Sequence, residues 1–424
     1  MIMVNYLKKL NSMQYYLVMS VCLAARLAGA KAYLVGGVVR DLILNQGHDD
    51  LDVVVEGDVS ETAKAVSLKL NARLVQHHQF KTATVILEDN GRLDFACARK
   101  EAYPHPGSLP VVSGGSLNED LFRRDFTINA MAISINDGDF GRLIDPYGGF
   151  DDIKDGKVRI LHEKSFLDDP TRILRAVRFE QRFDFRIESK TLRLLKEAIK
   201  MNVFKSISAQ RYAAEFKKIL NEKDVYVTLK RLSRLGGLRE ISETEKLPWP
   251  KLKVLQKNIL KGQIQINPEI DTQIKQWFLY WLCIAGNFSR KEISRLLKKF
   301  SFTKEEQKAL AGLPQVKETM KFLSGKKVKR SDVYSLLKGR PLPLAVYAYL
   351  TADNKMIKNR IKKFLNADIY ANLDINGDDL KQMGVHSGEK IGQTLKKCLL
   401  VKIDKGIKSK REELRVAREI LQLS

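Results

Sequence analysis

Two aspartates, Asp50 and Asp52, stand two residues apart at the mouth of a predicted strand and could hold metal ions. Side chains alternate along a strand, so both carboxylates would point to one face. Mg²⁺ takes one or two protein carboxylates and fills its other positions with water and phosphate oxygens. Ions held here could lower the pKa of an attacking hydroxyl and neutralise a triphosphate. A third acid, Asp94, lies on a later predicted strand that could pair beside the first. An isolated Asp-x-Asp pair is more often a solvated strand end than a metal site. The neighbouring sequence therefore determines which of the two interpretations is favoured.

A pair of glycines precedes the aspartates, and its position suits a phosphate-binding turn. Gly36 and Gly37 end a short apolar strand, predicted over residues 32–35, and open a helix over residues 38–44. Glycines at such a turn free backbone N–H groups to face an anion at the positive end of the helix. Arg40, one turn into that helix, could reach the same phosphates. A glycine pair alone usually marks only a turn, but followed by the Asp-x-Asp strand it predicts a nucleotide site with metal ligands.

An arginine-rich helix is predicted after Asp168, Asp169 and Pro170, which suit a first helical turn. Its arginines recur every three or four residues and therefore line one stripe of the helix: Arg172, Arg175, Arg178 and Arg182. A row of arginines is unsuited to pack in a hydrophobic core. The stripe is therefore either a charged face in contact with solvent or a set of contacts to a nucleotide.

Four blocks of sequence carry these residues in a fixed order. They are GGVVRD from Gly36, DLD from Asp50, LFRRDFTINAMAI from Leu121 and DDPTRILRAVRF from Asp168. With these blocks the chain resembles the class II tRNA nucleotidyltransferase and bacterial poly(A) polymerase family, within the polymerase-β-like superfamily. The resemblance covers roughly residues 30–220, with a looser likeness near the C-terminus.

The resemblance implies a role for each matched residue. Asp50 and Asp52 would be the ligands of Mg²⁺ and, together with Asp94, the catalytic acids. The residues expected to contact the nucleotide are Gly36, Gly37, Arg40, Arg124, Asp169, Arg172, Arg175 and Arg178.

The base-reading residues of the family are the second acid and the first arginine of the last block, which here are Asp169 and Arg172. Cytosine and adenine both present an amino donor beside a ring-nitrogen acceptor, so a carboxylate with a guanidinium can satisfy either base. Uracil and guanine present the opposite polarity. Arg175 and Arg178 would serve the triphosphate or the internal geometry of the arginine stripe, and Arg124 would contact the nucleotide.

The elements that must position these residues alternate between helix and strand in the first third of the chain. Helices are predicted over 17–28, 38–44 and 59–70, and strands over 32–35, 51–55, 72–76, 82–87 and 92–98. Residues 100–117 hold three prolines and three glycines, which favours a loop. From Ser165 onward the pattern is mostly helical.

The predicted fold class is therefore α+β. The resemblance implies a polymerase-β-like nucleotidyltransferase head with a mixed sheet over residues 1–150, followed by all-helical parts. These are a neck for nucleobase recognition over 151–220, an RNA-binding body over 221–370 and a tRNA-binding tail over 371–424.

The charge of the chain indicates a partner rich in phosphates. Its 424 residues include 74 Lys and Arg against 50 Asp and Glu, a formal charge of +24. A merely basic surface is the alternative interpretation. Lysine-rich helices in the second half suit contacts to an RNA backbone, which fits recognition of tRNA by shape.

The location expected from the sequence is the cytoplasm. The four cysteines are scattered without zinc-finger spacing, as in a reducing compartment. No run reaches the ~20 apolar residues of a membrane span, so no membrane partner is expected. The apolar run over 15–30 contains Arg26 and leads into the candidate site, so we do not expect a signal peptide.

The expected function is addition of C and A, from CTP and ATP, to the 3′ end of tRNA, which completes or repairs its CCA terminus. A partial adder of A or of CC alone is the first alternative, because the segment 100–121 departs from the aspartate- and arginine-rich pattern of many full CCA adders. A bacterial poly(A) polymerase and a non-catalytic RNA-binding protein are the others. The oligomeric state does not follow from the sequence.

Overall fold

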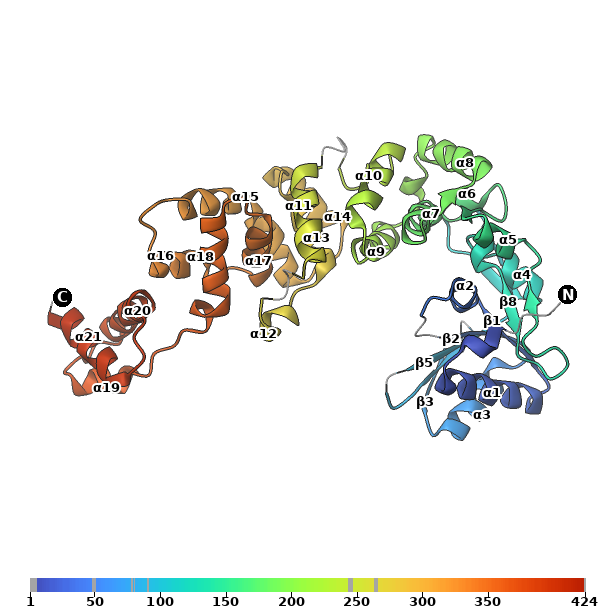
Figure 1. Cartoon of the computed structure of the whole chain (residues 1–424), viewed down its shortest axis with the longest axis horizontal. Coiled ribbons are helices and arrows are strands. Elements are labelled where there is room, and N and C mark those ends of the chain that lie inside the picture. The colour runs from blue at the N-terminus through green and yellow to red at the C-terminus, as the bar shows by residue number, and fades with distance from the viewer. Residues whose placement is uncertain are drawn as a thin grey trace. The chain divides into compact units, whose positions relative to one another are not determined.

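The computed structural model describes residues 6–47, 51–77, 79, 81–89, 91–242, 247–262 and 266–422. The chain divides into an N-terminal unit, residues 1–215 with 227–240, and a C-terminal unit, residues 216–226 with 241–424 (Figure 1). The predicted head and most of the predicted neck fall in the N-terminal unit. The division into four parts stays a prediction.

One seven-stranded sheet organises the N-terminal unit, with the strand order β3-β4-β5-β2-β1-β8-β9. Its strands are β1 Lys31–Val35, β2 Leu51–Glu56, β3 Arg73–His77, β4 Thr82–Ile86, β5 Arg92–Cys97, β8 Ala132–Ser134 and β9 Leu143–Ile144. Strands β2 and β5 run parallel, whereas the other neighbours are antiparallel. The predicted mixed sheet is confirmed.

The buried strands β1 and β2 hold the two sequence features that suggested a nucleotide site. Four successive residues of β1, Ala32 to Val35, are buried, as are Val53, Val54 and Val55 of β2. Such β-branched runs are typical of central strands that are covered on both faces. Helices α1 Ser12–Leu27 and α3 Val59–Leu70 lie together against one face of this sheet (Figure 1). The glycine turn and Asp52 are thus attached to the centre of the sheet.

Helix α1 begins five residues before the predicted start at Leu17. Asn11 accepts a hydrogen bond from the Gln14 backbone N–H, and the Gln14 side chain accepts one from the Asn11 N–H. This capping box satisfies backbone donors at the helix start. The predicted start was too late because it was taken from the first residue of the apolar stripe and not from the capping residues before it.

The segment predicted as a loop over residues 100–117 contains a regular hairpin, so that prediction is wrong in part. Strands β6 Arg99–Ala102 and β7 Val111–Gly114 pair antiparallel, and helix α4 Leu117–Phe122 follows. The prolines and glycines punctuate the turn and the ends of the hairpin. Because the paired residues are mostly polar or exposed, no apolar alternation marked these strands in the sequence.

Helices complete the N-terminal unit and carry the arginine stripe. Their bounds, with those of the glycine-turn helix, are α2 Gly37–Leu44, α5 Gly149–Lys154, α6 Ser165–Asp168, α7 Thr171–Arg182, α8 Ser189–Lys200, α9 Ala209–Leu220 and α10 Val225–Leu235. The last two of them, α9 and α10, each extend into residues 216–226 of the C-terminal unit. A two-stranded sheet joins β10 Lys157–Val158 to β11 Arg186–Ile187, and it holds the chain on either side of α7. The part predicted as an all-helical neck, residues 151–220, therefore also contains strands, which are too short to show an alternating pattern in the sequence. The sheet thus holds α7, which lines the pocket described in the next subsection.

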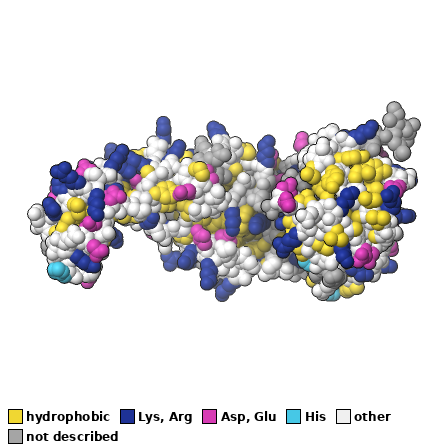
Figure 2. Space-filling view, turned by 90° about the horizontal axis from the view of Figure 1, so that it is seen from below, with side chains coloured by type: hydrophobic (Ala, Val, Ile, Leu, Met, Phe, Trp, Pro, Cys, Tyr) yellow, Lys and Arg dark blue, Asp and Glu magenta, His cyan; other side chains and the backbone are white. Residues whose placement is uncertain are grey.

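In the C-terminal unit every regular element that the structure describes is a helix, as predicted. The helices are α11 Trp249–Leu260, α12 Pro268–Asp271, α13 Gln276–Ala285, α14 Arg290–Lys299, α15 Lys304–Leu323, α16 Arg330–Leu337, α17 Leu342–Thr351, α18 Lys355–Asn366, α19 Gly377–Gln382, α20 Gly388–Lys405 and α21 Lys410–Gln422. Helix α13 is buried from Trp277 to Ala285 and forms a core. Lys and Arg side chains project from this unit's surface in Figure 2. Within the described ranges, no helix has the length and apolar character needed to cross a membrane.

Candidate active site

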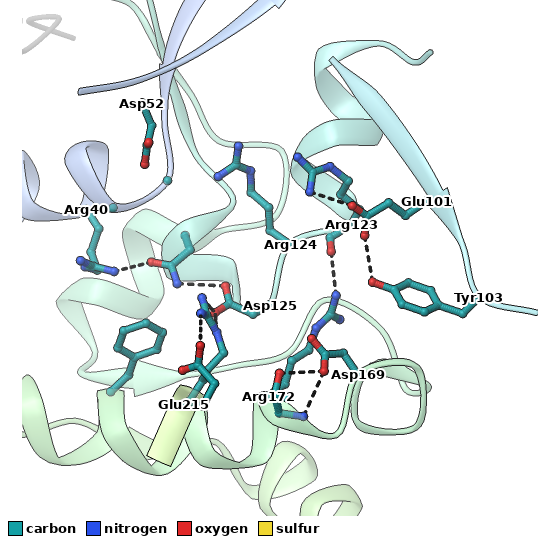
Figure 3. A pocket seen from close by; sticks show the side chains of 16 residues that line it. Arg40, Asp52, Glu101, Tyr103, Arg123, Arg124, Asp125, Asp169, Arg172 and Glu215 are labelled. Carbon is teal, nitrogen blue, oxygen red and sulfur yellow. Dashed lines mark hydrogen bonds and ion pairs between the residues drawn. The ribbon is translucent and has the colours of Figure 1, made fainter. Parts of the chain in front are cut away.

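A cavity of about 430 Å³ in the N-terminal unit collects most of the residues that the sequence singled out (Figure 3). Eight of the eleven predicted site residues line it: Gly36, Gly37, Arg40, Asp52, Arg124, Asp169, Arg172 and Arg175. Asp94 and Arg178 do not line it. Asp50 lies outside the described residues. The lining residues come from segments between β1 and α9, so the fold brings together positions more than a hundred residues apart.

The acidic side of the pocket is formed by strand β2. The Asp52 side chain is exposed and points into the cavity (Figure 3). Asp94 of β5 lies directly beside Asp52 in the parallel register and accepts a hydrogen bond from Thr84 Oγ1 at 2.6 Å. Residues paired in this way share one face of a sheet. Among the described residues, no third carboxylate, histidine or cysteine completes a metal-binding group with them.

The glycine turn allows an arginine to approach the backbone closely. Gly36 has a φ of +72°, and a Cβ atom at this position would lie 2.6 Å from Nη1 of Arg124. A side chain here would be both strained and in collision. Arg124 also donates to Asp120 Oδ2 at 2.9 Å. The glycine thus makes room for a guanidinium at the start of α2, the position that the sequence predicted for a phosphate.

Arg40, which the sequence assigned to phosphate contact, is engaged within the protein. It is buried, and it donates from Nε to Asp41 at 2.9 Å and from Nη1 to Asn129 at 2.6 Å. Its guanidinium also stacks 4.7 Å from the centre of the Phe183 ring. Burial lowers the pKa of Arg40, and the charge of Asp41 opposes this. These contacts join α2 to Asn129 and to the aromatic ring that follows α7; a phosphate contact by Arg40 stays a prediction.

Two carboxylates balance the arginine stripe of α7. Arg175 donates from Nε to Asp125 Oδ2 at 2.8 Å and lies 3.5 Å from Glu215 Oε1. Arg178 lies 3.9 Å from Glu215 Oε2 and does not line the pocket. Burial alone would raise the pKa of Asp125, but the charge of Arg175 and the hydrogen bond from Asn129 lower it to about 2. Arg175 and Arg178 are therefore paired with buried carboxylates, whereas Arg182, at the end of the stripe, is exposed.

The predicted base-reading pair is held rigidly at the other end of the pocket. Arg172 is buried and donates to Ser165 Oγ at 2.6 Å and to the Arg123 carbonyl oxygen at 2.8 Å. Asp169 accepts hydrogen bonds at Oδ1 from Thr171 and from Arg211. Among the described residues, no hydrogen bond is made to Asp169 Oδ2. This oxygen can accept from a ligand while the rest of the group stays fixed.

Sequence reasoning missed three residues that shape this end of the pocket. Glu101 and Tyr103 come from the hairpin, and Glu101 accepts from Arg99 and Arg123 at 2.9 and 3.1 Å. Arg211 of α9 joins Asp169 to the Gly107 carbonyl oxygen at the hairpin tip, at 2.9 and 2.6 Å. The alternation of residues 99, 101 and 103, along β6 and just past its end, was the sequence pattern that could have revealed Glu101 and Tyr103.

Comparisons with known proteins identify the relatives of this chain. Residues 32–159 match the poly(A) polymerase head domain. The A-adding tRNA nucleotidyltransferase of Geobacter sulfurreducens is 32% identical over 395 residues, which are 91% of this chain and 44% of that protein. The chain thus spans less than half the length of this curated relative.

Solved structures of related enzymes cover the chain more completely. A CCA-adding enzyme in its apo form is 32% identical, with a TM-score of 0.82 over 98% of this chain and 97% of that one. The CCA-adding enzyme of Thermotoga maritima, solved with tRNA, is 31% identical with a TM-score of 0.77 and the same coverage. Because likeness at this identity extends over nearly the whole of both chains, this chain belongs to the class II tRNA nucleotidyltransferase and poly(A) polymerase family.

Proposed function

We propose that this chain adds nucleotides to the 3′ end of tRNA without a template, taking C and A from CTP and ATP to complete or repair the CCA terminus. The observation that carries this proposal is the single pocket that holds Asp52, the Gly36 turn and the Asp169 and Arg172 pair. It unites an acidic position for metal ions, a turn suited to phosphates and a pair suited to a base.

The hydrogen-bonding groups of the pocket favour cytosine and adenine. Asp169 Oδ2 would accept from the exocyclic amino group, and Arg172 would donate to the neighbouring ring nitrogen. Uracil and guanine would place an oxygen against the carboxylate and an N–H against the guanidinium. Since both protein groups are held by neighbours, they cannot turn to accommodate the opposite polarity. This rigidity supports base selection by the protein itself.

The donor set of β2 fits Mg²⁺. Asp52 supplies a carboxylate that faces the cavity, Asp94 lies beside it, and Asp50 would supply the second ligand. The bound ion would lower the pKa of the tRNA 3′ hydroxyl and neutralise the triphosphate. Arg124, beside the Gly36 turn, would stabilise phosphate charge from the opposite side.

The helical parts of the chain would bind the body of tRNA, a role that suits residues 221–370 and 371–424, with 151–220 as the neck. Exposed lysines on successive helices support this, among them Lys298 and Lys299 of α14 and Lys362 of α18. Phosphate contacts of this kind supply affinity without reading sequence. The T. maritima relative was solved with tRNA, which also supports this partner. We assign the activity to the cytoplasm, where tRNA is matured.

A second candidate function, addition of the terminal A alone, is favoured by one observation. The G. sulfurreducens relative is an A-adding enzyme, and the likeness to it covers 91% of this chain. The pocket does not separate the two functions, because a pair that accepts adenine can also accept cytosine.

Three tRNA substrates separate the candidates when each is incubated with Mg²⁺, CTP and ATP, one of the two nucleotides being labelled. They end before the CCA sequence, after its first C, and after CC. A full adder extends all three to CCA, whereas an A-adding enzyme extends only the third, and only with ATP. A long ladder of A would identify a poly(A) polymerase. No incorporation with any substrate would refute the proposal and leave an RNA-binding protein.

A further inference from the structure

The hairpin β6–β7 places one aromatic side chain, Tyr103, in the pocket beside the predicted base-reading pair. Arg99, Glu101 and Tyr103 alternate with exposed residues, so the three side chains share one face of the hairpin, and Glu101 and Tyr103 line the cavity. In Figure 3 the Tyr103 ring lies beside Asp169 and Arg172, and its hydroxyl points to Glu101. Most of the side chains that line this pocket are charged, so the role of an aromatic ring among them has to be found either in its hydroxyl or in its face.

The hydroxyl of Tyr103 is already engaged and is not available for chemistry. It donates to Glu101 Oε2 at 2.8 Å, while Glu101 Oε1 accepts from Arg99 and Arg123. Burial raises the pKa of Tyr103, and the negative charge of Glu101 raises it further. The group therefore stays protonated near neutral pH and cannot act as a general base. What remains for a ligand is the face of the ring.

The ring is held at both ends, which suits it to be a fixed platform. Its backbone follows β6, and its hydroxyl is tied to a carboxylate that two arginines hold in turn. Side chains that are ordered before a ligand arrives lose little entropy on binding. The hairpin tip is anchored too, because the Gly107 N–H donates to the Leu167 carbonyl oxygen at 2.9 Å.

The other aromatic residue of the pocket, Phe179, is not open to a ligand. It is buried, and the guanidinium groups of Arg40 and Arg178 lie 5.3 and 4.8 Å from its ring centre. Tyr103 is only half-buried, and within the described part of the chain no aromatic ring or cation packs on its ring. It is thus the aromatic face that the pocket offers to an incoming base.

We infer that the ring of Tyr103 is the stacking surface for the base of the incoming ATP. This inference rests on the proposed function, in which Asp169 and Arg172 bind the edge of the base. A base held at its edge presents its two faces to the walls of the pocket, and a neighbouring aromatic ring gains dispersion and stacking energy from one of them. The stacking energy depends little on which hydrogen-bonding groups the edge of the base carries. Tyr103 therefore contributes binding affinity, whereas Asp169 and Arg172 contribute selectivity between bases.

The inference is tested by equilibrium binding of ATP to the full chain in the absence of tRNA, measured by calorimetry. Tyr103→Leu removes the ring and should raise the Kd for ATP about tenfold to a hundredfold, the range found when a base loses an aromatic partner. Tyr103→Phe keeps the ring and loses the hydroxyl, so its Kd should stay within about threefold of the unaltered protein. Tyr16→Leu, at an exposed tyrosine of α1, is the matched control and should bind ATP normally.

The outcomes separate this inference from the proposed function. An unaltered Kd for ATP in Tyr103→Leu would overturn the stacking role of Tyr103. An equal rise of the Kd in Tyr103→Phe and Tyr103→Leu would also overturn it, because the effect would then come from the hydroxyl. Hydrogen exchange at the Gly107 amide shows whether the hairpin is still docked in each variant. If the unaltered protein binds ATP in this way but extends no tRNA, the stacking role stands and the proposed function fails. If it binds no ATP, both fail.

Discussion

Arg211 donates from Nη2 to Asp169 Oδ1 at 2.9 Å, and its Nη1 donates to the carbonyl oxygen of Gly107 at 2.6 Å. One guanidinium therefore joins the predicted base-reading carboxylate to the tip of the hairpin. The Asp169 carboxylate is fixed by a residue more than forty positions away in the sequence.

Arg211→Met should relax base selection. The variant keeps the length of the side chain but removes the Arg211 donor to Asp169 and leaves only those of Thr171, so the carboxylate is held less firmly. We expect discrimination of ATP against GTP and UTP to fall about tenfold, since a hydrogen bond to a charged group contributes about 1.5–3 kcal/mol. Single-nucleotide incorporation kinetics on tRNA ending in CC measure this. Arg193→Met, at an exposed arginine of α8, should leave discrimination unchanged. Equal discrimination in Arg211→Met and the unaltered enzyme would contradict the role of Arg211.

Gly107→Ala should undock the hairpin tip. Gly107 has a φ of +69°, and a Cβ atom there would lie 2.1 Å from Ser206 Oγ and 2.6 Å from the Ser206 carbonyl oxygen. Since the backbone oxygen cannot move aside freely, the local cost should be about 1–3 kcal/mol. Faster hydrogen exchange at residue 107 is the expected sign.

A glycine in the same hairpin provides the control for this substitution. A Cβ atom at Gly114 would meet nothing within 4 Å, so Gly114→Ala should exchange like the unaltered protein. If the two alanine variants behave alike, the tip is not docked as described.

Asp125→Asn should destabilise the fold in a pH-dependent way. The lowered pKa of Asp125, about 2 against its ordinary 3.8, means that the ionised carboxylate stabilises the folded state. This contribution of about 2 kcal/mol is complete above about pH 5 and is lost as the pH falls from about 4 to about 2. At neutral pH the variant should lose about 3 kcal/mol, because Arg175 loses its closest carboxylate partner.

Urea unfolding at several pH values measures this difference. The gap in free energy of unfolding between Asp125→Asn and the unaltered protein should be constant from pH 7 to pH 5 and narrow below pH 4. A gap that stays the same down to the lowest pH at which both proteins fold would show that Asp125 is not held in its ionised form by Arg175.

The elements that carry the metal and phosphate positions could be predicted from sequence because their signals are local. Strand β2 is a β-branched run that begins beside its aspartates, and the Gly36 turn lies between an apolar strand and a helix. The pairing of Asp52 with Asp94 depends on the register of two strands that lie forty residues apart. Sequence patterns suggested that register but could not fix it.

The partners of the charged residues could not be predicted, because they come from distant segments. Arg40 was assigned to phosphates for its place in the glycine block, yet its Nη1 donor goes to Asn129, 89 residues away. Glu101 and Tyr103 were overlooked because strand β6 has no apolar periodicity. A buried charged group requires an oppositely charged or hydrogen-bonding partner, but the sequence alone does not show which residue supplies it.

The most direct test of the central claim is incorporation of labelled AMP from ATP into tRNA ending in CC, with Mg²⁺ present. The unaltered chain should add a single A, and chelation of the metal should abolish the reaction. Asp52→Asn should slow incorporation about a thousandfold or more, equivalent to ~4 kcal/mol of transition-state stabilisation, while tRNA binding in a filter assay is retained. Asp151→Asn, at an exposed aspartate of α5, should react normally. Undiminished incorporation by Asp52→Asn, or none by the unaltered chain, would contradict the assignment of this pocket as a nucleotidyltransferase site.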